Sequence, residues 1–141
     1  MPPQNLENLE KLGKLRREKP DQAEFDGLLR AGNRLLTDAQ NANLSMESRF
    51  ILGYDAAFSF AHAALRWKGY RAGDRYLVFQ VLPFTVGKDD IRVLILCHDR
   101  RNQVTYEGHD VERQLVTDLN KEAQDLLSRI SKLGLVQDAS G

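Results

Sequence analysis

The chain has a single cysteine, Cys97, among its 141 residues. One cysteine forms no internal disulfide and no cysteine-based zinc site, so packing alone must stabilise the fold. No window approaches the ~18 consecutive apolar residues of a membrane span. Residues 1–20 also lack the apolar stretch of a signal peptide. We therefore expect a cytoplasmic protein with no membrane contact, no metal and no cofactor.

Neither sign of charge is in excess, because 20 Lys and Arg residues balance 20 Asp and Glu residues. No global electrostatic field draws such a chain to DNA or to an anionic membrane, so any nucleic-acid site must be local. Hydrophobic residues at 42% and charged residues at 28% are ordinary for a globular domain. We expect one domain over residues 1–141, with its core at about 21–134 and with loose termini, MPPQ and QDASG.

Sustained alternation of apolar and polar residues is missing as well, which argues against a β-sheet protein. Apolar residues recur at helical spacing instead, and Asp21 with Glu24, Ser45 and Asp74 are expected to cap helices. The predicted helices cover residues 5–15, 21 to 41–43, 45–69, 74–83, 90–106 and 110–133. The sequence therefore predicts an all-α, up-and-down bundle of four to five main helices plus a short N-terminal helix.

The helix predicted over residues 45–69 has the strongest pattern. Its many alanines leave little side-chain bulk, so neighbouring helices can approach closely and the helix should be central. Phe58 lies among these alanines and is expected to be fully buried. In the preceding helix, Gly27 and Gly32 weaken helix formation unless they permit close helix contact.

The helix predicted over residues 90–106 changes character halfway. Its apolar stripe, Ile91 with Leu94 and Ile95, continues one turn later as polar side chains. These are His98, Arg101, Asn102 and Thr105. Two interpretations stay open: the last turns leave the core, with Arg100 and Arg101 complementing the helix C-terminal dipole, or the polar groups enter a cleft.

Cations and aromatic residues are mixed directly after the central helix. They are Arg66, Trp67, Lys68, Tyr70 and Arg71, and Arg100 is a further candidate cation. This mixture is typical of a platform for single-stranded nucleic acid, but cations also belong at a helix C-terminus and the rings can cover a loop. His62 lacks a ligand at metal-binding spacing, and Cys97 is expected to be a packed core thiol.

Several segments, in this order and spacing, carry a resemblance to a known superfamily. They are Ser48-Arg-Phe50, Tyr54-Asp-Ala-Ala-Phe58, Ala64-Leu65-Arg66, Gly69-Tyr70-Arg71, Leu82-Pro83, Arg101-Asn102 and Tyr106-Glu-Gly108. Over residues 24–133 the chain resembles the HEPN superfamily, and within it the small stand-alone bacterial proteins. The resemblance implies a HEPN-like helical bundle that pairs as a homodimer. It also implies metal-independent ribonuclease chemistry in a toxin–antitoxin or defence system, often beside a nucleotidyltransferase.

The catalytic motif of that superfamily is an Arg, commonly followed at once by a polar residue, with four to six residues between the Arg and a His. Arg101 and Asn102 match its first half, but Tyr106 stands where the His is expected and His109 comes one residue too late. A tyrosine near pKa ~10 is a poor base at neutral pH. His98, His109 or a group from the dimer partner are the alternative proton carriers.

From the resemblance we expect a homodimer that binds RNA or a nucleotide in a dimer cleft around Arg101 and Asn102. Ribonuclease activity would then be weak or degenerate, because the Arg–His motif is incomplete. The alternative is a non-catalytic interaction module that binds a protein partner, such as an antitoxin.

Overall fold

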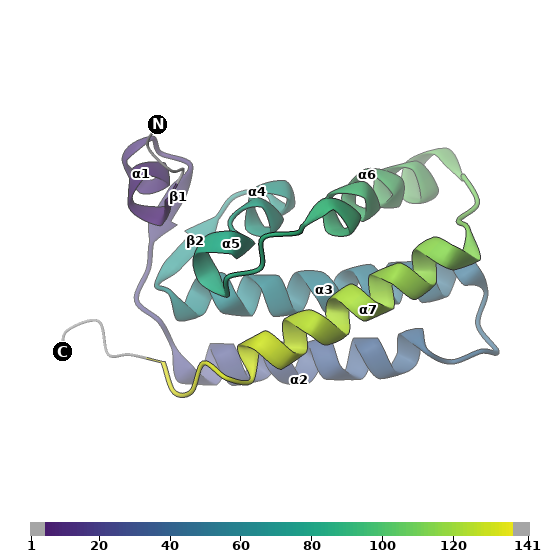
Figure 1. The fold of residues 1–141 in the computed structure, drawn as a ribbon, viewed down its shortest axis with the longest axis horizontal. Helices are drawn as coiled ribbons and strands as arrows, with labels where there is room; N and C mark the ends of the chain where they lie inside the picture. The colour runs from purple at the N-terminus through teal and green to yellow at the C-terminus, as the bar shows by residue number, and fades with distance from the viewer. Residues whose placement is uncertain (1–4, 137–141) are drawn as a thin grey trace.

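The computed structural model describes residues 5–136, so the predicted loose termini lie outside the described residues. Within that range the chain forms seven helices and one two-stranded sheet (Figure 1). The elements are α1 (Leu6–Lys11), β1 (Leu15–Arg17), α2 (Gln22–Ala39), α3 (Met46–Trp67), β2 (Tyr70–Ala72), α4 (Arg75–Gln80), α5 (Leu82–Thr85), α6 (Arg92–Glu107) and α7 (Arg113–Ile130). The expected helical character is confirmed.

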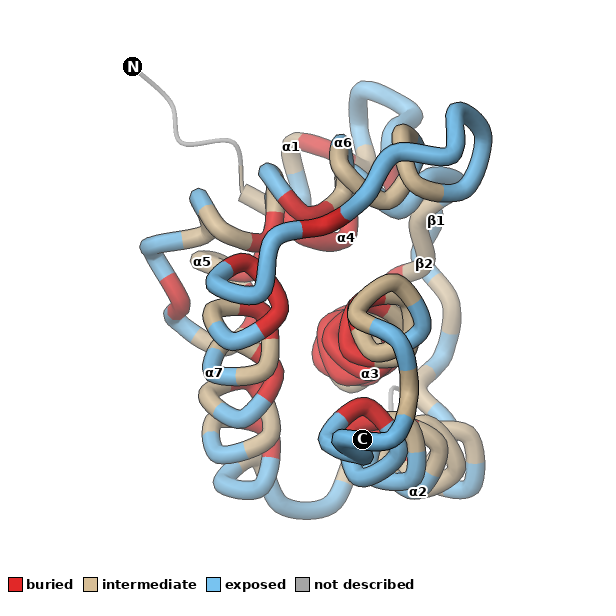
Figure 2. The backbone as a smooth tube through the Cα atoms, turned by 90° about the vertical axis from the view of Figure 1, so that its right-hand side faces the viewer, coloured by how far each residue is buried: buried red, intermediate tan, exposed pale blue. Residues whose placement is uncertain are grey.

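Helix α3 is the centre of the bundle, as its alanines predict. It packs against α2 and α7 on one side and against α4, α5 and α6 on the other. Figures 1 and 2 show it surrounded by these helices, with most of its length buried. Its start is set locally, because the Ser45 hydroxyl accepts a hydrogen bond from the Ser48 amide at 3.0 Å.

The close contact between α2 and α3 depends on a glycine. A Cβ atom at Gly32 would lie 2.3 Å from the Phe60 ring, so only glycine leaves room for that ring. Phe60 is completely buried as a result. The expectation for Phe58 is wrong: its side chain is only partly buried and lies against Phe79, His62 and Arg75 at the edge of the core.

The N-terminal segment differs from the single helix predicted over residues 5–15. Helix α1 ends at Lys11, and Gly13 turns the chain with a φ of 77°. The chain then forms β1, which pairs antiparallel with β2 so that Leu15 lies opposite Ala72. Leu15 is buried by this pairing while Leu12 is 63% exposed. The purely helical prediction is therefore wrong for these two short strands.

The region after the central helix also differs in detail. Where one helix was expected over residues 74–83, the chain forms α4 and α5, and Asp74 caps α4 through the Leu77 amide at 2.7 Å. Pro83 lies in the first turn of α5, where its missing N–H has no intrahelical partner to lose. Helices α6 and α7 begin two or three residues later than predicted. None of the helices within residues 5–136 is long and apolar enough to span a bilayer.

Replacing Phe60 or Phe58 with alanine should distinguish a position inside the core from a position at its edge. Phe60→Ala should lower the free energy of unfolding by about 3–5 kcal/mol, because it removes a fully buried ring. Phe58→Ala is the matched control and should cost clearly less. Urea denaturation followed by circular dichroism measures both, and equal losses would contradict this description of the α2–α3 interface.

Candidate functional site

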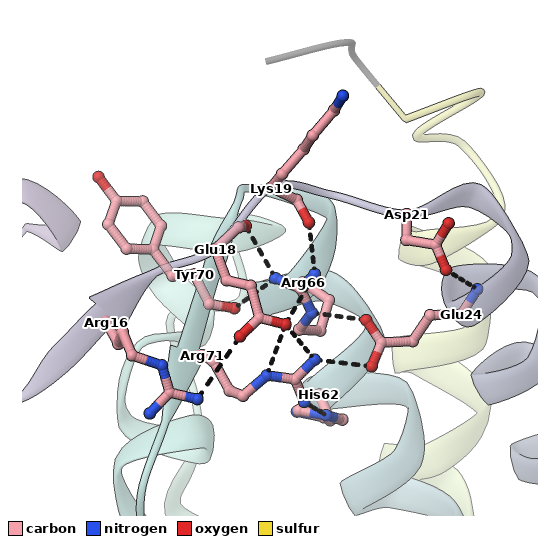
Figure 3. Close-up of polar contacts among 9 residues, drawn as sticks. All are labelled: Arg16, Glu18, Lys19, Asp21, Glu24, His62, Arg66, Tyr70 and Arg71. Atoms are coloured by element: carbon pink, nitrogen blue, oxygen red, sulfur yellow. Dashed lines mark hydrogen bonds and ion pairs between the residues drawn. The ribbon is translucent and has the colours of Figure 1, made fainter.

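Arg66 ends in a guanidinium that the fold encloses almost completely, with 2% of the side chain exposed. Its Nε donates to Glu24 Oε1 at 2.7 Å. Its terminal nitrogens donate to three backbone carbonyls, those of Glu18 (3.0 Å), Lys19 (2.7 Å) and Tyr70 (3.3 Å). Figure 3 shows these bonds converging from the linker before α2, from α2 itself and from β2. Arg66 therefore joins three segments of the chain.

Arg71 extends the same network toward solvent. Its Nη2 lies 2.7 Å from Glu18 Oε2 and 2.8 Å from Glu24 Oε2, so one nitrogen bridges both carboxylates. Hydrogen bonds from Arg71 lead the effects that lower the pKa of Glu18 to about 2. Burial opposes a low pKa at Glu24, but hydrogen bonds from Arg71 and Arg66 outweigh it and lower that pKa as well.

This network changes the interpretation of the predicted nucleic-acid platform. Arg66 and Arg71 face protein carboxylates, and Tyr70 is buried with its hydroxyl accepting from Arg17 at 2.8 Å. Trp67, Lys68 and Arg100 are the members of the predicted set that remain outside the network. The Asp21 carboxylate does accept from the Glu24 amide as expected, but Glu24 turns to the arginines instead of completing a capping box.

A second polar group surrounds Tyr54, near the middle of α3. Tyr54 is 1% exposed, and its hydroxyl lies 3.1 Å from His98 Nδ1 on α6. The guanidinium carbons of Arg75 on α4 and Arg101 on α6 lie 5.9 and 5.8 Å from the centre of its ring. We call Tyr54, Arg75, His98 and Arg101 the Tyr54 cluster. It joins three helices that are separate in the sequence.

The Tyr54 cluster has an excess of positive charge. Arg75 lies 3.6 Å from Asp55, whereas within residues 5–136 no carboxylate is within ion-pair distance of Arg101. The Nε atom of Arg101 is buried and has no hydrogen-bond partner among the described residues. An anion with several oxygens would supply the partners that Arg101 lacks.

The buried Tyr54 phenol contacts the imidazole of His98. Burial raises the pKa of Tyr54, so its hydroxyl stays protonated and can either donate to or accept from His98 Nδ1. This hydroxyl can therefore satisfy Nδ1 in either neutral tautomer of His98. The Tyr76 ring packs edge-on against His98 at 5.3 Å and helps to hold the imidazole.

The other motif candidates lie at the outer end of α6. Asn102 is exposed, and Tyr106 is 74% exposed beyond the last contacts with the bundle. His109 lies in the following loop, 3.5 Å from Glu107, and Arg100 binds Glu112 at 2.6 Å. The structure thus brings Arg101 together with His98 and leaves Tyr106 and His109 apart from both.

His62 and Cys97 are packed side chains. His62 stacks on Phe58 with an interplanar angle of 6°, and burial lowers its pKa. Cys97 is completely buried, and burial raises its thiol pKa to about 12, so it is not a nucleophile at neutral pH. Among the residues that the structure describes, no three His, Cys, Asp or Glu side chains are grouped to hold a metal ion.

Comparison of the chain with known proteins gives no assignment. No family model, no curated protein and no solved structure matches it. The geometry of the Tyr54 cluster and the chemistry of its side chains are therefore the indications of function that the chain itself offers.

Two members of the cluster were missed by the sequence analysis as functional residues. Tyr54 lies on the core face of α3, but its hydroxyl reaches a residue 44 positions away. Arg75 lies on α4, and its guanidinium lies over the Tyr54 ring. No local spacing connects Tyr54 and Arg75 with His98 and Arg101, so only the packing of α4 and α6 on α3 reveals the group.

The Glu18 carboxylate should make stability depend on acid pH. Its pKa is lowered from 4.5 to about 2 in the folded chain, so its contribution is fully present above pH 4.5 and is lost as the pH falls toward 2. We expect the melting temperature to fall over that window and to fall less steeply in Glu18→Gln. Glu112→Gln removes a carboxylate from a different ion pair and should retain the parent slope. Identical slopes in all three proteins would contradict the network.

Proposed function

We propose that the chain binds RNA through the Tyr54 cluster, with the phosphate held by Arg101 and Arg75. One observation carries the proposal: Arg101, buried at Nε, meets the Tyr54 ring and no carboxylate within residues 5–136. The buried cations among the described residues, Arg66 and Lys88, each contact two carboxylates. Arg101 is half-buried and contacts none, so its geometry best suits an external anion.

The resemblance to HEPN proteins supports the choice of RNA. Arg101 and Asn102 match the first half of the superfamily motif, and both lie on the C-terminal half of α6. We propose further that two copies of the chain pair, as HEPN proteins do, so that the clusters of both copies face one cleft. The mostly helical fold is compatible with this proposal.

The reaction class that fits these residues is metal-independent cleavage of RNA. In this reaction the 2′-hydroxyl attacks its own phosphorus, the bond from phosphorus to the 5′ oxygen breaks, and a cyclic phosphate forms. His98 would take the proton of the attacking hydroxyl, and the departing 5′ oxygen takes up a proton in turn. Arg101 and Arg75 would neutralise the charge that develops on the phosphate.

Binding tests the phosphate contact directly. Arg101→Ala should weaken the binding of a single-stranded RNA oligonucleotide about tenfold or more, because a charge-assisted contact to phosphate is worth ~1.5–3 kcal/mol. It should also make the slope of log affinity against log salt shallower. Fluorescence anisotropy of a labelled RNA at several salt concentrations measures both quantities.

Arg92→Ala is the matched control for charge, because it removes one exposed arginine from the first turn of the same helix. It should bind RNA like the parent. If both variants lose affinity equally, the binding reflects general charge and not the Tyr54 cluster. If neither loses affinity, RNA does not contact Arg101, and the alternative of a protein-interaction module gains support.

Cleavage tests the choice of proton carrier. His98→Ala should reduce the rate of RNA cleavage in the presence of a chelator by ~10²–10⁴-fold, the usual contribution of a general acid or base. His109→Ala and Tyr106→Phe should cleave at the parent rate, since both side chains lie outside the cluster. Circular dichroism confirms that His98→Ala remains folded. A rate that collapses in His109→Ala would show that the wrong histidine has been assigned.

A further inference from the structure

A cavity of about 400 Å³ lies at the end of the molecule opposite the outer end of α6. It opens between the linker before α2 and the C-terminal end of α3. Its lining residues are Arg17, Glu18, Lys19, Pro20, Trp67, Lys68 and Gly69. The volume is within the range of small-molecule sites, ~300–1,000 Å³. None of its lining residues belongs to the Tyr54 cluster.

The rings of Trp67 and Pro20 give the cavity apolar walls. The Trp67 indole is held in place because its Nε1 donates to the Gly134 carbonyl at 3.2 Å. Pro20 lies close to the turn at Gly69, where a Cβ would sit 3.7 Å from its ring atoms. The turn itself needs glycine, with a φ of 90°. A rigid indole beside a proline ring suits a flat ligand.

The charges around the cavity favour an anion. Glu18 is the one carboxylate among the lining residues, and its oxygens are bound by Arg71 at 2.7 Å and by Arg16 at 3.5 Å. Figure 3 shows that carboxylate turned into the Arg66 network. Lys68 Nζ lies 5.5 Å from the centre of the Trp67 ring, with no carboxylate of residues 5–136 in ion-pair contact.

We propose that this cavity binds a planar aromatic ring that carries a phosphate, as in a free nucleoside monophosphate. The base would stack on Trp67 beside Pro20, and Lys68 would hold the phosphate. The proposal is independent of the proposed RNA site. Trp67 and Tyr54 are thirteen residues apart on α3, which is about 20 Å along the helix at ~1.5 Å per residue.

The single tryptophan of the chain makes the test specific. Titration with adenosine 5′-monophosphate should quench Trp67 fluorescence, excited beyond the absorption of adenine, and the quenching should saturate. Adenosine and inorganic phosphate, each offering half of the ligand, should bind at least tenfold more weakly. No quenching by the nucleotide, or equal quenching by adenosine, would overturn the proposal.

Two lysine variants test the phosphate contact. Lys68→Ala should weaken nucleotide binding about tenfold, whereas Lys121→Ala, an exposed lysine on α7, should leave it unchanged. Equal weakening in both variants would overturn the assignment of Lys68. Fluorescence of the unliganded proteins at increasing urea shows that both variants are folded.

A substitution variant and a shortened chain distinguish this proposal from its alternatives. Arg101→Ala should retain full nucleotide binding even if it loses RNA, because the two sites are apart. Loss of nucleotide binding in Arg101→Ala would mean that one site serves both ligands and would overturn the proposal. A chain shortened after Val136 should bind like the full chain. If only the shortened chain binds, the occupant of the cavity is residues 137–141 and not a nucleotide.

Discussion

The burial of the Arg66 guanidinium is the constraint on which the N-terminal half of the architecture depends. A guanidinium keeps its charge at every pH that the fold experiences, so burying it requires partners for its N–H groups. Glu24 supplies a carboxylate, and the linker at Glu18 and Lys19 supplies two carbonyls. To provide them, the linker must cross the end of α3, and this path places β1 beside β2.

Two arginines on different helices, Arg66 on α3 and Arg101 on α6, lie in contrasting environments. Arg66 is bound by carboxylate and carbonyl oxygens, which fill most of its donor positions. Arg101 contacts an aromatic ring and leaves a buried Nε without a partner in the described chain. A ring attracts a cation without accepting all of its hydrogen bonds, so Arg101 keeps donors for an oxygen-rich anion. The contacts of Arg66 stabilise the fold, whereas those of Arg101 suit the recognition of an anion.

The sequence predicted the features that are determined by residues close together in the chain, such as helix caps. The caps at Asp21, Ser45 and Asp74 were correct because each bonds an amide three residues ahead. The sequence-based prediction failed where a residue that is distant in the sequence determines the local structure. Phe60 is buried because Gly32, on another helix, leaves room for its ring, whereas Phe58 lies against Phe79 at the edge of the core. Strand β1 is three residues long and exists only because β2 pairs with it, so it leaves no periodic signal.

The candidate site shows the same division between local and distant information. The motif spacing directs attention to the residues after Arg101, but α6 carries those residues past its contacts with the bundle, and a base at Tyr106 would be solvated and unsupported. His98 precedes Arg101 by three residues on the same helix face, ~5–6 Å away. There α3 and α4 provide a phenol and a ring that hold the imidazole. Helix periodicity makes a position before the arginine equivalent to one after it, so packing decides which of the two side chains is held in place beside Arg101.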